Sequence, residues 1–461
     1  MKFIFADSMD FVDPGYDFIR DRNADGRSPY WDDVYPHQLL DRIPYDGVLV
    51  SRGIVGGAAV AGKYSEAQAM RFRRVGARAF LRLDTAELAH LPIFGDCGAF
   101  TYSKEEVPPY TPEDMLEFYA DGEFTHGCSV DHIIFDFDMD AAAQGSSDAR
   151  RRYDITLENA DAFLKASRTM PSSFTPLGVV QGWSPASMAE AARKLCAMGY
   201  DYLALGGTVP LKSDQIKACL EAVRAAVPND TRIHILGFAK ADDVGSFARF
   251  SITSFDTTSP LIRAFKDARH NYYLGGHDGR ISYYTAIRVP QALENTKLLR
   301  LAKRGALNQE ALVKLERSAL DSLRRYDNNA ASVEETVEKV LAYAAPALLG
   351  GTIDDLPGSN DIRQLEERYR RTLEDRPWKQ CGCAICSKLS IEVIIFRASN
   401  RNKRRGIHNL QVYKNLIDTI TQGGGNAGHF DLFGASGEPE RQPYGLVAGR
   451  QSIGPQALCS H

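Results

Sequence analysis

Hydrophobic residues recur along the first 260 positions in short runs, each followed by a turn and by a segment with helical spacing. Eight runs can be distinguished, at 2–6, 47–51, 91–100, 132–138, 176–182, 202–207, 232–238 and 252–257. Most are continuously apolar, which is typical of strands buried on both faces of a parallel sheet. Eight strand-helix units predict an α/β fold with a closed (β/α)₈ barrel of the TIM type, and a doubly wound open sheet is the alternative.

The segments between the later runs have clear helix signals. After the fifth run, Ser184 suits an N-cap, Pro185 suits the first helical position and Gly199 suits the end of the helix. The connections after the first two runs are longer and contain loop-like sequence, so these two units are the least clearly defined. We expect the barrel to occupy residues 1–292.

The pattern becomes helical beyond residue 292. Three segments with amphipathic spacing, at 308–326, 332–348 and 360–376, precede a cluster of cysteines, and a further one follows at 408–422. A mainly helical second domain is predicted over 293–421. Residues 422–461 are rich in glycine and polar residues without periodicity, which predicts a flexible tail.

Composition and charge narrow the possible functions. The chain has 461 residues, of which 44% are hydrophobic and 25% charged, so it can bury a large core. Its formal net charge of -4 means that a nucleic acid could be held only by a local basic patch. No run approaches the roughly 20 apolar residues that span a bilayer, and Asp7 interrupts the first run. We therefore expect a cytoplasmic protein with no membrane partner.

Polar residues interrupt the predicted strands at their C-terminal ends. They are Asp96, Asp136, Asp138, Gln181, Gly206, Gly207 and Asp256. The C-terminal ends of barrel strands converge on one mouth, which is where such barrels carry their active sites. A single aspartate there could simply cap a loop or helix. Their recurrence on several strands indicates a site, because each buried carboxylate is costly unless it is paired or solvated.

Five motifs resemble those of one enzyme family. DCGAF (96–100) is similar to the DSGGF motif of the tRNA-guanine transglycosylases, and VVQG (179–182) and LALGG (203–207) are similar to their VQG and GG segments. SFDTTSP (254–260) resembles the segment with their nucleophilic aspartate, and CGCAIC with His408 resembles their zinc site. The motifs occur in the family's order over roughly residues 90 to 410.

The resemblance implies a role for each residue at the barrel mouth. Asp256 would be the nucleophile and Asp96 the general acid/base. Asp138, with Asp136 as the alternative in an ambiguous register, would accept hydrogen bonds from the guanine N1 and amino groups. Gln181 and the backbone at Gly206 and Gly207 would complete the base pocket.

The chemistry of base exchange requires such groups independently of the family. Displacement of a purine at C1′ passes through an oxocarbenium-like transition state, in which one carboxylate can form a covalent glycosyl-enzyme while a second protonates the leaving base. A carboxylate is also the expected acceptor for the donors on the guanine edge. ATP and redox cofactors are not required, and the sequence contains no GxxxxGK[ST] phosphate loop.

The cysteine cluster predicts a structural metal site. Cys381, Cys383, Cys386 and His408 would satisfy a closed tetrahedral Zn²⁺ site with no position left for water. The run RNKRR, with Arg401, Lys403, Arg404 and Arg405, lies beside the fourth ligand and is a candidate for binding phosphate. A solvated basic loop is the alternative interpretation.

Departures from the tRNA enzymes bear on the substrate. DCGAFTY replaces their DSGGFQ pattern, and the segment after Asp256 lacks their usual continuation. This combination resembles the DNA-modifying branch of the family, which inserts 7-deazaguanine derivatives, in particular 7-cyano-7-deazaguanine, into DNA as part of a modification system that can include other proteins. A tRNA-guanine transglycosylase is the second hypothesis.

Other classes of function remain open from the residues alone. FDFDMD (135–140) could bind a divalent cation in a metal-dependent barrel hydrolase, and His270 with His277 could ligate a metal. A non-catalytic subunit that only binds nucleic acid is a further alternative, although it would not need both Asp96 and Asp256.

Overall fold

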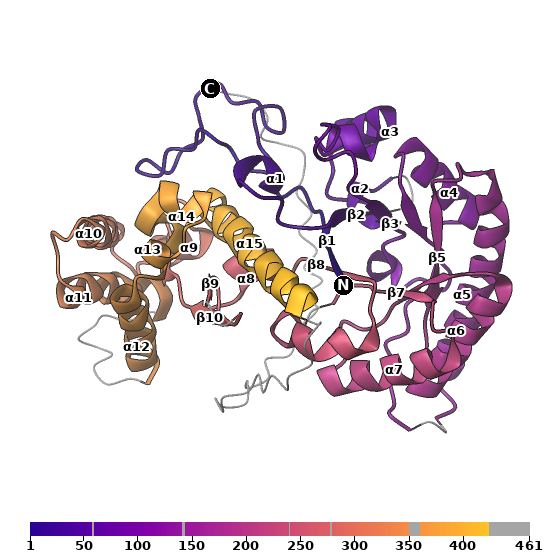
Figure 1. Ribbon diagram of the computed structural model, residues 1–461. Coiled ribbons are helices and arrows are strands. Elements are labelled where there is room, and N and C mark those ends of the chain that lie inside the picture. The colour runs from indigo at the N-terminus through magenta and orange to yellow at the C-terminus, as the bar shows by residue number, and fades with distance from the viewer. Residues whose placement is uncertain (58–59, 141–142, 239, 277–278, 350–359, 424–461) are drawn as a thin grey trace. The chain divides into compact units, whose positions relative to one another are not determined.

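Eight parallel strands form a closed barrel in the computed structural model (Figure 1). The structure describes residues 1–57, 60–140, 143–238, 240–276, 279–349 and 360–423. The strands are β1 (Lys2–Ala6), β2 (Gly47–Ser51), β3 (Ile93–Asp96), β4 (His126–Cys128), β5 (Thr175–Val180), β6 (Tyr202–Leu205), β7 (Arg232–Ile235) and β8 (Ser254–Thr257). The (β/α)₈ prediction is therefore confirmed.

Pairing of the first strand with the last closes the barrel. Lys2–Phe5 lie beside Ser254–Thr257 in parallel register, so Ile4 is opposite Asp256. Alternate residues of the strands point inward and form a small apolar core, which consists of Ile4, Leu49, Phe94, Cys128, Leu177, Val179, Tyr202 and Ala204. The next inward positions toward the C-terminal mouth are therefore available for polar side chains.

Helices surround the barrel strands (Figure 1). They are α1 (Pro36–Leu39), α2 (Arg52–Val55), α3 (Glu66–Phe80), α4 (Pro112–Asp121), α5 (Ser147–Ala166), α6 (Pro185–Met198), α7 (Ser213–Ala226) and α8 (Ser259–Lys266), with 3₁₀ turns η1 (Ala99–Tyr102), η2 (Ser167–Thr169) and η3 (Ala241–Phe250). The signals predicted for α6 are present, since the Ser184 hydroxyl accepts from the Ser187 amide and Gly199 has a φ of 116°.

The fourth predicted strand is wrong. Strand β4 is the short segment His126–Cys128, and residues 132–138 follow it as irregular chain. Ile133 and Ile134 are buried there, which explains an apolar run outside a strand. Position 127 has space only for a glycine, because a Cβ there would lie 2.6 Å from the ring of Tyr119. Strand β4 therefore lacks the apolar run that is expected of a barrel strand.

The chain beyond the barrel is mainly helical, as predicted. Its elements are strands β9 (Tyr272–Gly275), β10 (Ile281–Tyr284), β11 (Ile287–Arg288) and β12 (Ile395–Phe396), helices α9 (Thr296–Lys303), α10 (Gln309–Asp327), α11 (Val333–Ala344), α12 (Asn360–Asp375), α13 (Pro377–Gln380), α14 (Ala384–Leu389) and α15 (Ser399–Gly423), and turns η4 (Ala345–Leu349) and η5 (Ser390–Ile394). Met1–Gln422 form one compact unit. The boundary expected at 292/293 therefore marks a change in the sequence pattern inside this unit. The predicted tail lies almost entirely outside the described residues.

Helix α15 packs directly against the barrel. The ring of Tyr413 meets that of Phe3 edge to face, with 5.2 Å between the centroids. The Asn409 amide donates to the carbonyl oxygen of Pro260 at 3.1 Å. A Cβ at Gly406 would lie 2.9 Å from the carbonyl oxygen of Leu261, so a glycine allows the close approach of α15 to α8.

The basic run in α15 is buried, which contradicts its prediction as a phosphate-binding patch. Arg401 and Arg405 have no exposed surface, Arg404 is 4% exposed and Lys403 is half-buried. Arg401 pairs with Asp21 and Glu392, while Arg405 donates to the carbonyl oxygens of Val393 and Ile395.

The other two cations of the run bond to the N-terminal segment. Lys403 donates to the carbonyl oxygens of Met9 and Phe11, and Arg404 donates to that of Asp13. Burial lowers the pKa of Arg404 to about 10 and that of Arg405 to about 9. The positive charges of RNKRR thus satisfy acceptors inside the protein.

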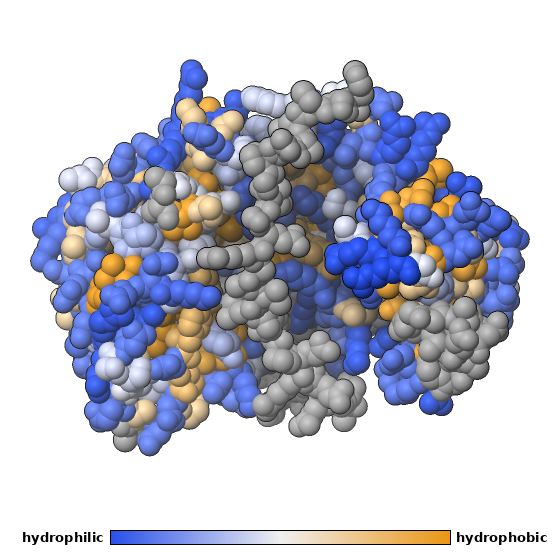
Figure 2. Space-filling view, turned by 180° about the vertical axis from the view of Figure 1, so that it is seen from behind, coloured by the Kyte–Doolittle hydropathy of each residue, from blue (hydrophilic) through white to orange (hydrophobic). Residues whose placement is uncertain are grey.

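Hydrophilic side chains cover most of the surface seen from behind, with hydrophobic ones in scattered patches (Figure 2). Among the helices that the structure describes, none combines the length and the apolar character needed to cross a bilayer.

Replacement of Arg401 by Ala should destabilise the protein by about 3–5 kcal/mol, because Asp21 and Glu392 would each lose one of two arginine partners inside the protein and keep only Arg397 and Arg324. Urea unfolding measures the change. Arg363→Ala removes an exposed arginine from α12 and should alter stability by less than about 0.5 kcal/mol. Equal stability of the two variants would show that Arg401 is solvated.

Candidate active site

Asp96 ends β3 at the barrel mouth. Its Oδ1 atom is buried and has no hydrogen-bond partner among the described residues. Burial raises the pKa of Asp96 to about 7, with a further contribution from the charges of Asp256 and Asp131, while hydrogen bonds from Ser51 and Gly98 oppose the shift. Near neutral pH this carboxyl can therefore hold or release a proton, as a general acid/base must.

Asp256 is the penultimate residue of β8 and is 6% exposed. Its Oδ1 atom accepts from the Gly237 amide at 2.9 Å and lies 3.1 Å from Nε2 of His234. No hydrogen bond to Oδ2 is found within the described chain. Two carboxyl groups with different surroundings thus lie at the mouth on β3 and β8, and the charge of Asp256 contributes to the raised pKa of Asp96.

A third carboxylate at the mouth, Asp131, was missed by the sequence analysis. It is 5% exposed, and it accepts from Nε2 of Gln181 at 2.6 Å and from the thiol of Cys97 at 3.1 Å. Burial raises the pKa of Asp131. The chain reaches this position because Ser129 extends the β4 path, with its amide donating to the Leu177 carbonyl at 2.9 Å. The sequence signal for Asp131 is its position directly before the apolar run 132–138, shortly after β4 ends.

Gln181 and the two glycines lie together beside Asp131. The Oε1 atom of Gln181 accepts from the Ile134 amide at 3.3 Å, so both ends of the side-chain amide are held. A Cβ on Gly206 would lie 2.3 Å from Nε2 of Gln181, and Gly207 has a φ of 68°. The glycines therefore leave space for Gln181 and expose backbone at the mouth.

Asp136 and Asp138 are exposed in the segment after β4, which is not the strand on which their predicted role depended. The Asp136 carboxylate accepts from the Ser146 hydroxyl at 2.5 Å, and that of Asp138 accepts from the Asp140 amide at 2.9 Å. The structure thus gathers Asp96, Asp256, Gln181, Gly206 and Gly207 with Asp131, while Asp136 and Asp138 bond within their own loop.

Comparison with known proteins identifies the family. The chain is 42% identical over 421 residues to a DNA-guanine transglycosylase of Salmonella montevideo, covering 90% of this chain and 96% of that protein. The chain belongs to the DNA-guanine transglycosylase family. It is accordingly an enzyme of the pentosyltransferase class. A scan against models of protein families gave no match.

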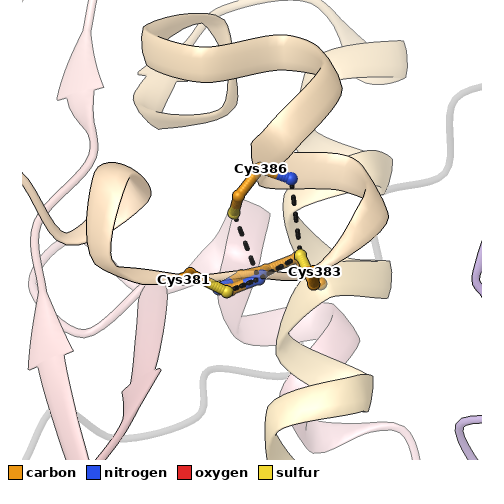
Figure 3. A group of neighbouring side chains, drawn as sticks. Cys381, Cys383 and Cys386 are labelled. Carbon is orange, nitrogen blue, oxygen red and sulfur yellow. Dashed lines mark hydrogen bonds between the residues drawn. The ribbon is translucent and has the colours of Figure 1, made fainter.

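A cluster of four side chains that could hold a metal ion lies outside the barrel of this family member. The ligand atoms of Cys381, Cys383, Cys386 and His408 all lie within 4.8 Å of one another. The three cysteine side chains come from the α13–α14 region and turn toward one common point (Figure 3). His408 is contributed by α15 and places Nδ1 between 3.3 and 3.7 Å from the three sulfur atoms.

The surroundings of His408 fit a metal ligand. Its Nε2 atom lies 2.7 Å from the carbonyl oxygen of Tyr273, so Nε2 carries the proton and Nδ1 presents a lone pair to the sulfur atoms. Three thiols and one imidazole nitrogen form a donor set that Zn²⁺ prefers. Within the described part of the chain, no other group of three or more potential ligands gathers, and His277 lies outside it.

The raised pKa of Asp96 generates a test of stability against pH. The folded state binds the Asp96 proton more tightly than the unfolded state, so ionisation of Asp96 costs stability as the pH rises from about 4 to about 7. Asp96→Asn should therefore be more stable than the wild type by about 1–3 kcal/mol at pH 8, with the advantage lost below pH 4. Urea unfolding at several pH values measures this difference.

Asp230→Asn serves as the control for this experiment, because Asp230 is exposed. Its stability should follow that of the wild type at each pH. The same pH profile in both variants would remove the argument that Asp96 is protonated near neutral pH.

Removal of one metal ligand should affect metal content and stability together. We expect Cys383→Ser to lose bound zinc and to lower the melting temperature by roughly 5–10 °C. Elemental analysis and thermal unfolding provide the two measurements. Cys196→Ser, on α6 and outside the cluster, should change neither. Full stability without metal would exclude a structural role for the cluster.

Proposed function

We propose that this protein replaces guanine in DNA with a 7-deazaguanine derivative, in particular 7-cyano-7-deazaguanine, through a covalent aspartyl-glycosyl intermediate. The observation that carries the proposal is the difference between two neighbouring carboxyl groups. Asp96 has an unpartnered buried oxygen and a pKa near 7, whereas one oxygen of Asp256 is held by the Gly237 amide and by Nε2 of His234. Such a pair supplies an acid/base and a nucleophile at neutral pH.

The reaction proceeds in two displacements. An oxygen of Asp256 bonds to C1′ while the bond from C1′ to the base nitrogen breaks, and the electron pair leaves with guanine, which takes a proton from Asp96. The incoming base then gives a proton to Asp96 and attacks C1′, releasing the Asp256 carboxylate. Each step inverts C1′, so the exchanged nucleotide keeps its configuration.

Recognition of the base is assigned to Asp131 in place of Asp136 and Asp138. Guanine presents an N1–H and an amino group as donors, and the carboxylate of Asp131 is the buried acceptor beside Gln181. The backbone at Gly206 and Gly207 borders the same space, where a flat ring can approach closely. The nucleotide must leave its stack to reach these groups.

DNA is favoured over tRNA as the substrate because the relative at 42% identity is a DNA-guanine transglycosylase. Contacts to phosphate must come from a surface other than RNKRR. Helix α9 and its C-cap residue carry four exposed cations, Lys297, Arg300, Lys303 and Arg304. Lys297, Arg300 and Arg304 have the i, i+3 and i+7 spacing of one face. None forms an ion pair within the described chain, so they can meet phosphates without losing a partner.

Zinc would have a structural role in this enzyme. Four ligands would complete the coordination that Zn²⁺ prefers in structural sites. The cluster joins the α13–α14 segment to α15. Since α15 also contacts the barrel, the metal would stabilise the packing of the helical region against the barrel.

The proposed function is tested by exchange with two nucleic acids. The wild type should incorporate labelled guanine into genomic DNA and form an adduct that survives denaturation, and Asp256→Asn should fold but form none, because an amide is a poor nucleophile. Mass spectrometry of nucleosides from DNA and tRNA of cells with and without the gene identifies the product. A modified nucleoside confined to tRNA would contradict the DNA assignment, and an adduct on Asp256→Asn would contradict the nucleophile.

Simultaneous replacement of the four α9 cations by Ala should weaken DNA binding and reduce its salt dependence by about one unit of slope for each lost phosphate contact. Salt titrations of DNA binding measure the slope. A variant with the same change in charge is the control: Arg151, Lys165, Lys194 and Arg249 are replaced by Ala, each of which pairs with a nearby acid. Equal slopes for both variants would exclude α9 from the DNA-binding surface.

A further inference from the structure

A chain of hydrogen bonds runs from Asp256 into the interior of the barrel. Nε2 of His234 lies 3.1 Å from Oδ1 of Asp256, and Nδ1 of the same ring lies 2.6 Å from the Ser254 hydroxyl. That hydroxyl lies 2.7 Å from the hydroxyl of Tyr202. His234, Ser254 and Tyr202 are at most 2% exposed, so protein groups rather than bulk water satisfy these atoms.

The barrel register places this chain directly beneath the mouth. His234 on β7 is paired with Ser254 on β8, and Asp256 is the next inward position of β8 toward the mouth. The ring of Phe94 stacks on that of His234 with centroids 5.2 Å apart and planes 23° apart. The imidazole is thus fixed by one stacking contact and by a bond at each nitrogen.

The role of nucleophile proposed for Asp256 requires a carboxylate, and this sets the direction of the hydrogen-bond chain. A carboxylate only accepts, so Nε2 must carry a proton and donate it to Asp256. With the Nε2 proton donated to Asp256, Nδ1 can accept from the Ser254 hydroxyl, which in turn accepts from Tyr202. Burial raises the pKa of Tyr202 to about 12, so its hydroxyl keeps the proton that this arrangement needs.

The two oxygens of Asp256 are not equivalent. Oδ1 accepts both from His234 and from the Gly237 amide, which lies 2.9 Å away. Oδ2 has no hydrogen-bond partner among the described residues. It is also not one of the fully buried atoms without a partner, so it has some exposed surface. Oδ2 therefore keeps its lone pairs and is in contact with the open mouth.

We propose that His234 is a positioning residue which, together with the Gly237 amide, occupies Oδ1 of Asp256 and leaves Oδ2 as the atom that attacks C1′. The inference rests on the proposed function and adds which oxygen reacts and what orients it. A lone pair of Oδ2 forms the bond to C1′ as the base leaves with the electrons of the broken bond and takes its proton from Asp96. His234 keeps its proton throughout, because Oδ1 becomes the ester carbonyl oxygen and still accepts.

Three substitutions separate positioning from simple packing. His234→Phe keeps a ring against Phe94 but removes the donor. His234→Gln can place an amide N–H near the position of Nε2, and His234→Asn is too short to reach Asp256 although it can still bond to Ser254. Thermal unfolding identifies any variant that fails to fold, and the comparison of Gln with Asn then depends only on the donor to Asp256.

The kinetic measurement is the rate of adduct formation with genomic DNA. Exchange of labelled guanine gives the KM for guanine. We expect His234→Phe and His234→Asn to form adduct about 10- to 100-fold more slowly, the effect of one hydrogen bond to a charged group. The KM for guanine should stay within about twofold, because Asp131 and Gln181 are unchanged. His234→Gln should recover most of the rate. Wild-type adduct formation in the Phe variant, or equal rates for Gln and Asn, would overturn the proposal.

A measurement without turnover separates this inference from the proposed function. In ¹⁵N NMR of the full chain labelled at histidine, His234 should show a protonated Nε2 and an unprotonated Nδ1, and Asp256→Asn should shift the Nε2 signal. A protonated Nδ1, or an Nε2 signal that does not respond to Asp256→Asn, would overturn the bonding pattern. A wild type that exchanges no guanine would contradict the proposed function while leaving the NMR result to test the hydrogen bonds.

Discussion

The parallel pairing of β1 with β8 is the contact on which the site depends. Without it, the sheet would remain open and its two edge strands would be far apart. With it, the mouth brings together Asp96 from β3, Asp131 from the β4 path and Asp256 from β8. Three carboxyl groups then share a space enclosed by apolar strands. Burial raises the pKa values of both Asp96 and Asp131, and the charges of Asp256 and Asp131 add to the shift at Asp96.

The three carboxyl groups differ in the hydrogen-bond donors that they receive. Asp256 receives two N–H groups on one oxygen, and Asp131 receives an amide and a thiol on separate oxygens. Asp96 keeps an oxygen without any donor. Differences in hydrogen bonding, and not differences in residue type, separate the roles that we propose for the three aspartates.

Much of this arrangement was accessible from the sequence, and the exceptions have physical reasons. Continuous apolar runs located seven strands, and motif order located Asp96, Gln181 and Asp256. The fourth strand was misplaced because burial, and not strand structure, made Ile133 and Ile134 apolar. The predicted base-recognition role was therefore placed on Asp138 or Asp136, and Asp131 was left out. The charge of RNKRR was visible, but its acceptors are contributed by residues 9–21 and 390–396, which no local pattern connects to it.

The contact of α15 with the start of the chain has a consequence for synthesis on the ribosome. Phe3 lies in the first strand and packs on Tyr413, and Lys403 bonds to the carbonyl oxygens of Met9 and Phe11. About four hundred residues must be made before these N-terminal groups meet their final partners. The nascent barrel therefore emerges with an uncovered apolar flank, which makes the interval before α15 is complete the period in which the chain is most exposed to aggregation and to chaperone binding.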